Sequence, residues 1–233
     1  MLKKKNIKVI GFDADDTLWV NESYYNEVEE NLGKLLKDFL TPGETSRILF
    51  ETEIRNLPIY GYGIKAFILS VIETSLKITH NKIPHEKIVE IIEMGKAMLN
   101  KPIELLDGIE EVLQELYNRN FRLIVATKGD LLDQERKLEK SGLEKYFHHI
   151  EIMSDKQESN YKKLINHLDI KPQEFLMVGN SVKSDILPVL NLGGNAIHIP
   201  YHTTWAHEEV KDTGAYNFET VESVRQVPEL LDA

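Results

Sequence analysis

The sequence of 233 residues contains no cysteine. Disulfide bonds, thiolate metal ligands and catalysis by cysteine are therefore excluded. Long apolar runs are also absent: the longest, around residues 66–72, is far shorter than the ~18–20 residues that span a bilayer. The lysine-rich residues 1–5 precede no apolar segment of the kind that a secretory signal needs. We therefore expect a soluble, cytoplasmic protein that does not bind membranes.

Basic residues are the minority charge, with 28 lysines and arginines against 38 aspartates and glutamates, so the formal net charge is −10. A surface of this sign repels polyanions, and we expect no nucleic-acid partner, although a local basic pocket for a small anion is compatible with it. The hydrophobic share of 42% is ordinary for a globular protein. The length predicts one large domain or a core with a smaller companion, and leaves monomer and homodimer both open.

Short apolar segments rich in β-branched residues alternate with amphipathic segments along much of the chain. The segments with the length and composition of strands are residues 7–12, 121–126, 149–153, 175–178 and 196–199. The predicted helices are residues 131–140, 159–167 and 182–192, and one that begins at residue 109. Strands that alternate with helices predict an α/β fold with a parallel sheet and crossover helices.

Residues 21–100 differ from the rest because they carry no strand signal. Apolar stripes at helical spacing predict helices around residues 28–39, 44–55, 64–77 and 88–99. Between the second and third of these, residues 55–63 contain two glycines and several aromatics and are interpreted as a loop. The simplest organisation is an all-helical domain of residues 21–100, inserted into an α/β core of residues 1–20 and 101–233.

An acidic cluster of Asp13, Asp15 and Asp16, followed by Thr17, comes directly after the first predicted strand. Aspartate is common in turns, so a solvated turn is one interpretation. Because side chains alternate along a strand, Asp13 and Asp15 start on the same side. Two carboxylates so close repel each other unless a divalent cation or a shared proton relieves the repulsion. The cluster also follows the carboxyl end of a strand, where open parallel sheets bind ligands.

The next three predicted strands also end in polar groups. Thr127 and Lys128 end the second strand beside a glycine, a sequence suited to surrounding an oxyanion with backbone N–H groups. Lys156 follows the third strand, and Asn180 and Asp185 follow the fourth, where a helix-start acid is the alternative role for Asp185. Each signal is weak by itself, but their recurrence at four strand ends indicates a functional site.

This ordered set resembles the four motifs of the haloacid dehalogenase-like (HAD) hydrolase superfamily. The first motif, Asp-x-Asp-x-Thr, is matched by Asp13, Asp15 and Thr17, and the second, a hydroxyl that closes a strand, by Thr127. The resemblance covers residues 7–20 and 105–201. It implies a Rossmann-like core and identifies the all-helical insert as similar to the α-helical cap of the family.

The remaining two motifs match less closely. The third motif, a lysine ahead of the fourth strand, is matched best by Lys156, with Lys162 and Lys163 as competitors. The fourth, a turn followed by an acid, is matched by Asn180 and Asp185, although the family usually has an acid at the position of Asn180. A second departure is Asp16, where the family often has glycine.

The resemblance implies a Mg²⁺-dependent phosphatase that works through an aspartyl-phosphate. Asp13 would be the nucleophile, and Asp15 the general acid and then the general base. The implied ligands of Mg²⁺ are Asp13, Asp15, Asn180 and Asp185. The implied phosphate-binding residues are Asp16, Thr127, Lys128 and Lys156, of which Thr127 and Lys156 also count as catalytic.

Three alternatives lie within the same superfamily. Members that cleave carbon–halogen bonds need no second acid at the position of Asp15, so a dehalogenase is disfavoured. A phosphomutase would use the same four motifs and stays open. Asn180 also leaves open a catalytically weak member that binds a phosphometabolite without turning it over.

The resemblance implies a small phosphorylated metabolite as the substrate, selected by the cap. Trp19 and Asn21 follow the first motif directly, and Arg55 lies in the loop predicted inside the helical domain. These three residues are the candidate substrate contacts. A helix–helix connection without contact to substrate is the alternative interpretation of the region around Arg55.

Overall fold

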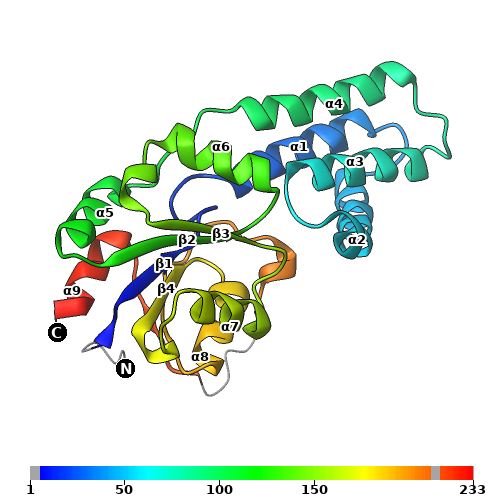
Figure 1. The fold of residues 1–233 in the computed structure, drawn as a ribbon. Coiled ribbons are helices and arrows are strands. Elements are labelled where there is room, and N and C mark those ends of the chain that lie inside the picture. The colour runs from blue at the N-terminus through cyan, green and yellow to red at the C-terminus, as the bar shows by residue number, and fades with distance from the viewer. Residues whose placement is uncertain (1–5, 211–215, 233) are drawn as a thin grey trace. The chain divides into compact units, whose positions relative to one another are not determined.

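The computed structural model describes residues 6–210 and 216–232. Residues 1–5, whose sequence argues against a secretory signal, are outside that range. The described chain contains a sheet of parallel strands in the order β3-β2-β1-β4-β5-β6 (Figure 1). The strands are β1 (Val9–Phe12), β2 (Arg122–Lys128), β3 (His149–Met153), β4 (Phe175–Gly179), β5 (Asn195–His198) and β6 (Glu219–Thr220). The predicted α/β fold is confirmed, and β6 is a strand that the sequence did not indicate.

The register of the three central strands aligns their carboxyl ends. Phe12, the last residue of β1, pairs with Val125 of β2 on one side and Val178 of β4 on the other. Beyond this point, the N–H of Asp13 donates a hydrogen bond of 2.9 Å to the carbonyl of Val178. The acidic cluster therefore begins between its two neighbouring strands, at the edge where parallel sheets bind ligands.

Helices cover both faces of the sheet, which is why its strands are almost continuously apolar. The helices of this unit are α5 (Ile109–Asn118), α6 (Leu131–Ser141), α7 (Glu158–His167), α8 (Leu187–Asn191) and α9 (Val227–Asp232). Side chains of α5, α6 and α9 pack against one face, around Phe12 and Val125. Those of α7 and α8 pack against the other, around Ile124 and Met177 (Figure 1). Alternate residues of each strand thus enter different hydrophobic clusters, as the period of two requires.

Short helical turns occupy several connections of the same unit. The 3₁₀ turns are Glu144–Tyr146, Pro172–Glu174, Ala206–Glu208 and Val224–Gln226, and Val182–Ile186 is a π-helical turn. The predicted helix over residues 182–192 is therefore a π turn that continues as α8. No helix among the described residues is long and apolar enough to cross a membrane.

The described residues fall into two compact units. One contains the sheet and comprises residues up to 22, 103–128 and from 134 onward; the other comprises residues 23–102 and 129–133. Residues 22–102, all of which are described, contain no strand and form α1 (Glu22–Leu35), α2 (Pro42–Tyr60), α3 (Ile64–Ile78) and α4 (His85–Asn100). This helical unit has its own hydrophobic core, with Leu32, Leu49, Val71 and Ile91 at its centre.

The loop predicted over residues 55–63 is wrong, because α2 continues to Tyr60. The helix passes through Pro58, which removes only one backbone hydrogen bond this close to the end of a helix. Two residues earlier, buried Asn56 donates a hydrogen bond of 3.1 Å to the Ser70 hydroxyl of α3, which keeps this face of α2 docked. The helix ends at Gly61, whose φ of 73° suits glycine and whose N–H donates to the carbonyl of Leu57.

The position of Pro58 inside α2 predicts a measurable gain in stability on its replacement. Pro58→Ala restores an N–H to the helix and should raise the free energy of unfolding by about 1 kcal/mol, less than for a helix interior. Pro42→Ala is the matched control, because proline suits the first turn where Pro42 lies. It should lower stability slightly. Urea unfolding followed by circular dichroism measures both, and a destabilised Pro58→Ala variant would contradict a helix that extends to Tyr60.

Candidate functional site

A buried lysine lies between two buried carboxylates at the carboxyl edge of the sheet. The Nζ of Lys156 is 2.5 Å from Oδ1 of Asp13 and 2.6 Å from Oδ1 of Asp185. The three side chains are almost completely inaccessible to solvent. Lys162 and Lys163, the competing candidates for the third motif, are exposed on α7. The geometry therefore brings Lys156, and neither competitor, to Asp13.

Burial and the charge of the neighbouring partner shift the pKa values of Asp13 and Lys156 in opposite directions. Burial raises the pKa of Asp13 to about 7; the Lys156 charge opposes the rise and the Asp185 charge adds to it. Burial by itself would lower the pKa of Lys156, but the charges of Asp13 and Asp185 raise it above its usual range. The lysine is thus a permanent cation beside Asp13.

Asp185 is fixed by the backbone of the turn that precedes it. Its Oδ2 accepts a hydrogen bond of 2.9 Å from the N–H of Ser181. Gly179 lies so close that a Cβ on it would be 2.3 Å from Oδ2 of Asp185. Glycine is therefore required at the end of β4 for the carboxylate to reach Lys156.

A hydroxyl connects the first and fourth motifs. The Oγ1 of buried Thr17 lies 3.5 Å from Oδ2 of Asp13 and 3.3 Å from Oδ1 of Asn180. The backbone carbonyl of Asn180 contacts Nε2 of His198 at 3.0 Å. The side-chain oxygens of Asp13 and Asn180 therefore converge on one side of the Lys156 cluster.

The carboxylate of Asp15 has different partners from that of Asp13. Its Oδ1 accepts hydrogen bonds from Nε1 of Trp19 at 2.8 Å and from Nζ of Lys137 at 3.0 Å. Its Oδ2 accepts one of 2.7 Å from Nε2 of Gln134. Asp15 is thus held by three donors, two of which belong to α6.

Trp19 and Asn21, predicted as substrate contacts, both lie in the hydrogen-bond network around Asp15. Trp19 is completely buried and its indole N–H is used on Asp15. Buried Asn21 accepts a hydrogen bond of 2.8 Å from Lys137. Contact of either residue with a substrate stays a prediction. Arg55, in the helical unit, is about half exposed and lies 3.4 Å from Glu73.

Asp16 closes the turn that carries the cluster. Its backbone adopts a φ of 61°, and its N–H donates to the carbonyl of Trp19 at 2.8 Å. Its carboxylate accepts the N–H groups of Asn21 and Glu22. Burial raises the pKa of Asp16 to about 7. These contacts give Asp16 a structural part in the turn, and phosphate binding by Asp16 stays a prediction.

Thr127 and Lys128 end β2, as predicted. Thr127 is buried and its hydroxyl donates to the carbonyl of Lys128 at 3.1 Å. The Nζ of Lys128 contacts Oγ of Ser184 at 2.9 Å and Oε1 of Glu208 at 2.6 Å. The ammonium of Lys128 is therefore already paired with an acid.

Glu208 was not anticipated from the sequence. Its Oε2 accepts hydrogen bonds from the hydroxyls of Ser181 at 2.6 Å and Ser184 at 2.5 Å. Burial would raise the pKa of Glu208, but the charge and hydrogen bond of Lys128 and the two serines lower it to about 2. Glu208 comes from a 3₁₀ turn far along the chain, and nothing in its local sequence marks it. Gln134 and Lys137 were also missed, although their i, i+3 spacing places them on one face of α6.

The oxygen atoms of this site fit a hard divalent cation. Among the described residues, no three or more His, Cys, Asp or Glu side chains form a group that could hold a metal ion. Asn180 is not one of these four residue types, but an amide oxygen also serves as a metal ligand in proteins. Oδ1 of Asn180 and Oδ2 of Asp13 both lie within 3.5 Å of the Thr17 hydroxyl. Mg²⁺ accepts amide and backbone oxygens and usually retains water. The donor set is therefore compatible with Mg²⁺ through oxygens of mixed kind.

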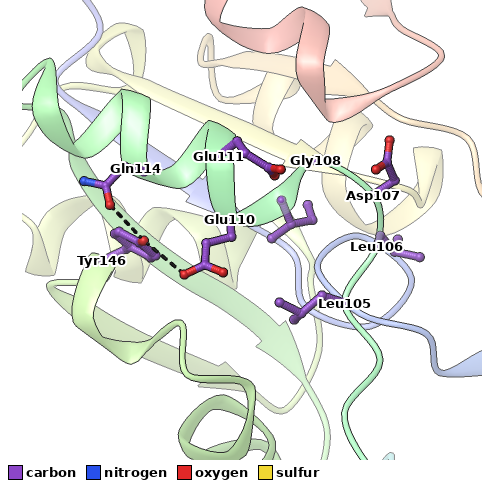
Figure 2. A pocket seen from close by; sticks show the side chains of 9 residues that line it. Leu105, Leu106, Asp107, Gly108, Glu110, Glu111, Gln114 and Tyr146 are labelled. Carbon is purple, nitrogen blue, oxygen red and sulfur yellow. Dashed lines mark hydrogen bonds between the residues drawn. The ribbon is translucent and has the colours of Figure 1, made fainter.

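A hollow of about 510 Å³ lies elsewhere on the sheet-containing unit (Figure 2). Its lining residues are Leu105, Leu106, Asp107, Gly108, Ile109, Glu110, Glu111, Gln114 and Tyr146. In the wall of the hollow, the Tyr146 hydroxyl donates hydrogen bonds to the side-chain oxygens of Gln114 and Glu110. No residue of the four motifs lines this hollow, so it is separate from the candidate site.

The comparisons with known proteins agree with this geometry. The family model of haloacid dehalogenase-like hydrolases matches residues 7–193. The chain belongs to this family. The resemblance inferred from the motifs is thereby confirmed, and the protein is a HAD-like hydrolase.

Relatives of this HAD-like hydrolase include two phosphatases. The glyceraldehyde 3-phosphate phosphatase of Methanothermobacter thermautotrophicus is 23% identical over 236 residues, which cover 97% of this chain and 100% of that protein. The N-acylneuraminate-9-phosphatase of Homo sapiens is 27% identical over 149 residues, or 60% of this chain and 57% of that protein. The crystal structure of a HAD-like hydrolase from Xanthomonas campestris matches with a TM-score of 0.86 and 35% identity, over 97% of this chain and 91% of that one. The expectation of a hydrolase of the phosphatase type agrees with both named enzymes.

The network around Glu208 predicts a pH-dependent contribution to stability. Its folded pKa of about 2 lies below the usual 4.5, so its stabilising effect is complete above pH 4.5 and is lost as pH falls toward 2. Glu208→Gln should therefore lower the free energy of unfolding by about 2–3 kcal/mol at pH 7 and by less than about half of that at pH 3.

Urea unfolding of the wild type and the Glu208→Gln variant at the two pH values measures the difference between their free energies of unfolding. The matched control is Glu209→Gln, which changes the exposed neighbouring acid and should alter stability little at either pH. A difference in free energy of unfolding that is equal at pH 7 and pH 3 would show that Glu208 is not ionised in the folded protein.

Proposed function

We propose that this hydrolase is a phosphatase that removes phosphate from a small phosphorylated metabolite through an aspartyl-phosphate on Asp13. The observation that carries the proposal is the contact of Asp13 with Lys156 at 2.5 Å, at the carboxyl edge of the sheet. A carboxylate nucleophile and a permanent cation together suit attack on a dianionic phosphate, since the cation reduces repulsion between them. Lys156 cannot lose its charge while both carboxylates face it.

The first step forms the aspartyl-phosphate. A carboxylate oxygen of Asp13 attacks phosphorus in line, and the bond from phosphorus to the leaving oxygen breaks. Asp15 donates a proton to that oxygen as the product alcohol departs. Lys156 neutralises charge on the phosphoryl oxygens, and Thr127 and Lys128 bind the same oxygens by hydrogen bonds.

The second step regenerates the enzyme. A water molecule attacks phosphorus and gives its proton to Asp15, and the bond between phosphorus and Asp13 breaks to release inorganic phosphate. Asp15 therefore serves as acid and then as base. Asp15 lies two residues after Asp13, on the turn closed by Asp16, and so is close to the proposed nucleophile.

Mg²⁺ is the proposed cofactor. The residues that would hold it are Asp13, Asn180 and Asp185, with the backbone carbonyl of Asp15, because the Asp15 side chain is engaged elsewhere. When bound, the ion supplies charge neutralisation between the nucleophile and the phosphate. Asn180 offers a neutral oxygen where the family usually has an acid.

The helical region of residues 21–100 is proposed as the cap that selects the substrate. Arg55 is its candidate contact for a second anionic or hydroxyl group, because it is about half exposed and its ion pair with Glu73 is a weak surface pair. The names of the two related phosphatases both describe phosphate esters of small molecules. A small phosphorylated metabolite is therefore the proposed substrate class.

Release of inorganic phosphate from phosphosugars, nucleotides and an aryl phosphate tests the function. Turnover should require added Mg²⁺ after treatment with a chelator. Asp13→Asn should lower kcat by at least about 10³-fold, because the amide is not a nucleophile. Asp169→Asn is the matched control: Asp169 is exposed, and asparagine tolerates its φ of 54°, so activity should not change.

Other outcomes would reject the proposal. Isomerisation of a phosphosugar without net release of phosphate would indicate a mutase. A folded protein that releases no phosphate from any compound would indicate a binding member of the family, with Asn180 the residue to examine first.

A further inference from the structure

The donors on Asp15 come from two places in the fold. Trp19 belongs to the same turn as Asp15, whereas Gln134 and Lys137 project from one face of α6. Both oxygens of the carboxylate are engaged, Oδ1 by Trp19 and Lys137 and Oδ2 by Gln134. Donors on both oxygens fix the rotation of a carboxylate, which a single hydrogen bond does not.

The orientation of the Gln134 amide is set by Asp15. Its Nε2 donates to Oδ2 of Asp15 at 2.7 Å and to the carbonyl of Lys128 at 2.9 Å. In that orientation its Oε1 is buried and has no hydrogen-bond partner among the described residues. A buried unpaired acceptor costs about 1–3 kcal/mol. The chain tolerates this cost in exchange for an amide N–H directed at Asp15.

Lys137 brings a positive charge to the same carboxylate. Its Nζ is 3.0 Å from Oδ1 of Asp15 and 2.8 Å from Oδ1 of Asn21, and its side chain is mostly buried. Trp19, Gln134 and Lys137 therefore all donate to the Asp15 carboxylate, and Lys137 is a cation. These contacts hold the Asp15 carboxylate in one orientation.

We propose that Gln134 and Lys137 are positioning residues that hold Asp15 as the general base for hydrolysis of the aspartyl-phosphate. The proposal rests on the proposed function. In this step the oxygen of water bonds to phosphorus, the bond from phosphorus to Asp13 breaks, and the proton of water goes to Asp15. The step depends on a carboxylate that is fixed in position. Departure of an aryl leaving group needs no proton and does not depend on it.

Steady-state kinetics with an aryl phosphate separate the two steps. The value of kcat/KM reports formation of the aspartyl-phosphate, and kcat reports its hydrolysis when that step is slow. Lys137→Met and Gln134→Leu should each lower kcat by about tenfold and leave kcat/KM within about twofold, so KM falls with kcat. Lys137→Arg keeps the charge and should recover most of kcat.

Two controls separate positioning from general damage. Lys140→Met removes an exposed lysine of the same helix and should leave both constants unchanged. In an Asp15→Asn background, where the base is absent, adding Lys137→Met should change kcat by less than about twofold. Circular dichroism and thermal unfolding confirm that each variant is folded.

The outcomes distinguish this inference from the proposed function. Equal losses in kcat and kcat/KM, or a Lys137→Met loss that is as large without Asp15, would overturn the positioning role while Asp13-dependent turnover remained. A wild-type protein without turnover, or with turnover that Asp13→Asn does not reduce, would overturn the proposed function and this inference with it.

Discussion

The charge arrangement around Lys156 is the constraint on which the rest of the site depends. One ammonium lies between the carboxylates of Asp13 and Asp185, and all three groups are removed from water. A buried charge without a partner is strongly destabilising, so none of the three is dispensable to the others. Two carboxylates face this one cation. Burial and Asp185 accordingly raise the pKa of Asp13, a state that a divalent cation would relieve.

Each member of this cluster reaches it because a strand ends there. Asp13 follows β1, Lys156 lies in the segment after β3, and Asp185 follows β4. Parallel strands bring these ends to one edge, and the pairing of β1 with both β2 and β4 makes β1 the centre. Around the cluster lies a second set of contacts that fixes it: Glu208 holds the two serines and Lys128, and α6 holds Asp15. The strand ends thus carry the charged residues of the cluster, and the helices and turns carry the residues that orient them.

The sequence predicted the first set well and the second poorly, for a physical reason. Asp13 directly follows an apolar segment, and Lys156 and Asp185 lie in the connections after two others, so local pattern and parallel topology together predict their meeting. Gln134 and Lys137 lie on a polar helix face, which by pattern is indistinguishable from a solvated one. Glu208 reaches Lys128 across 80 positions of sequence, from a turn with no periodicity. The error at residues 55–63 arose from Pro58, since a proline ordinarily ends a helix, whereas here the packing of Asn56 on α3 keeps α2 helical to Tyr60.

The two aspartates of the first motif have different surroundings. Asp13 is enclosed with a lysine and another acid, whereas Asp15 is about a quarter exposed and surrounded by donors. The proposed nucleophile and the proposed general acid and base therefore have different surroundings, although only one residue separates them. Two titratable groups with such different environments are a common feature of acid–base sites.

The most direct test is to identify the phosphorylated residue during turnover. The protein is mixed with the best phosphate ester and Mg²⁺, quenched with acid within milliseconds, digested and examined by mass spectrometry. The account predicts one phosphoryl group on the peptide that contains Asp13, at a site removed by Asp13→Asn. Release of phosphate with no phosphorylated peptide, or with the phosphoryl group on another residue, would contradict it.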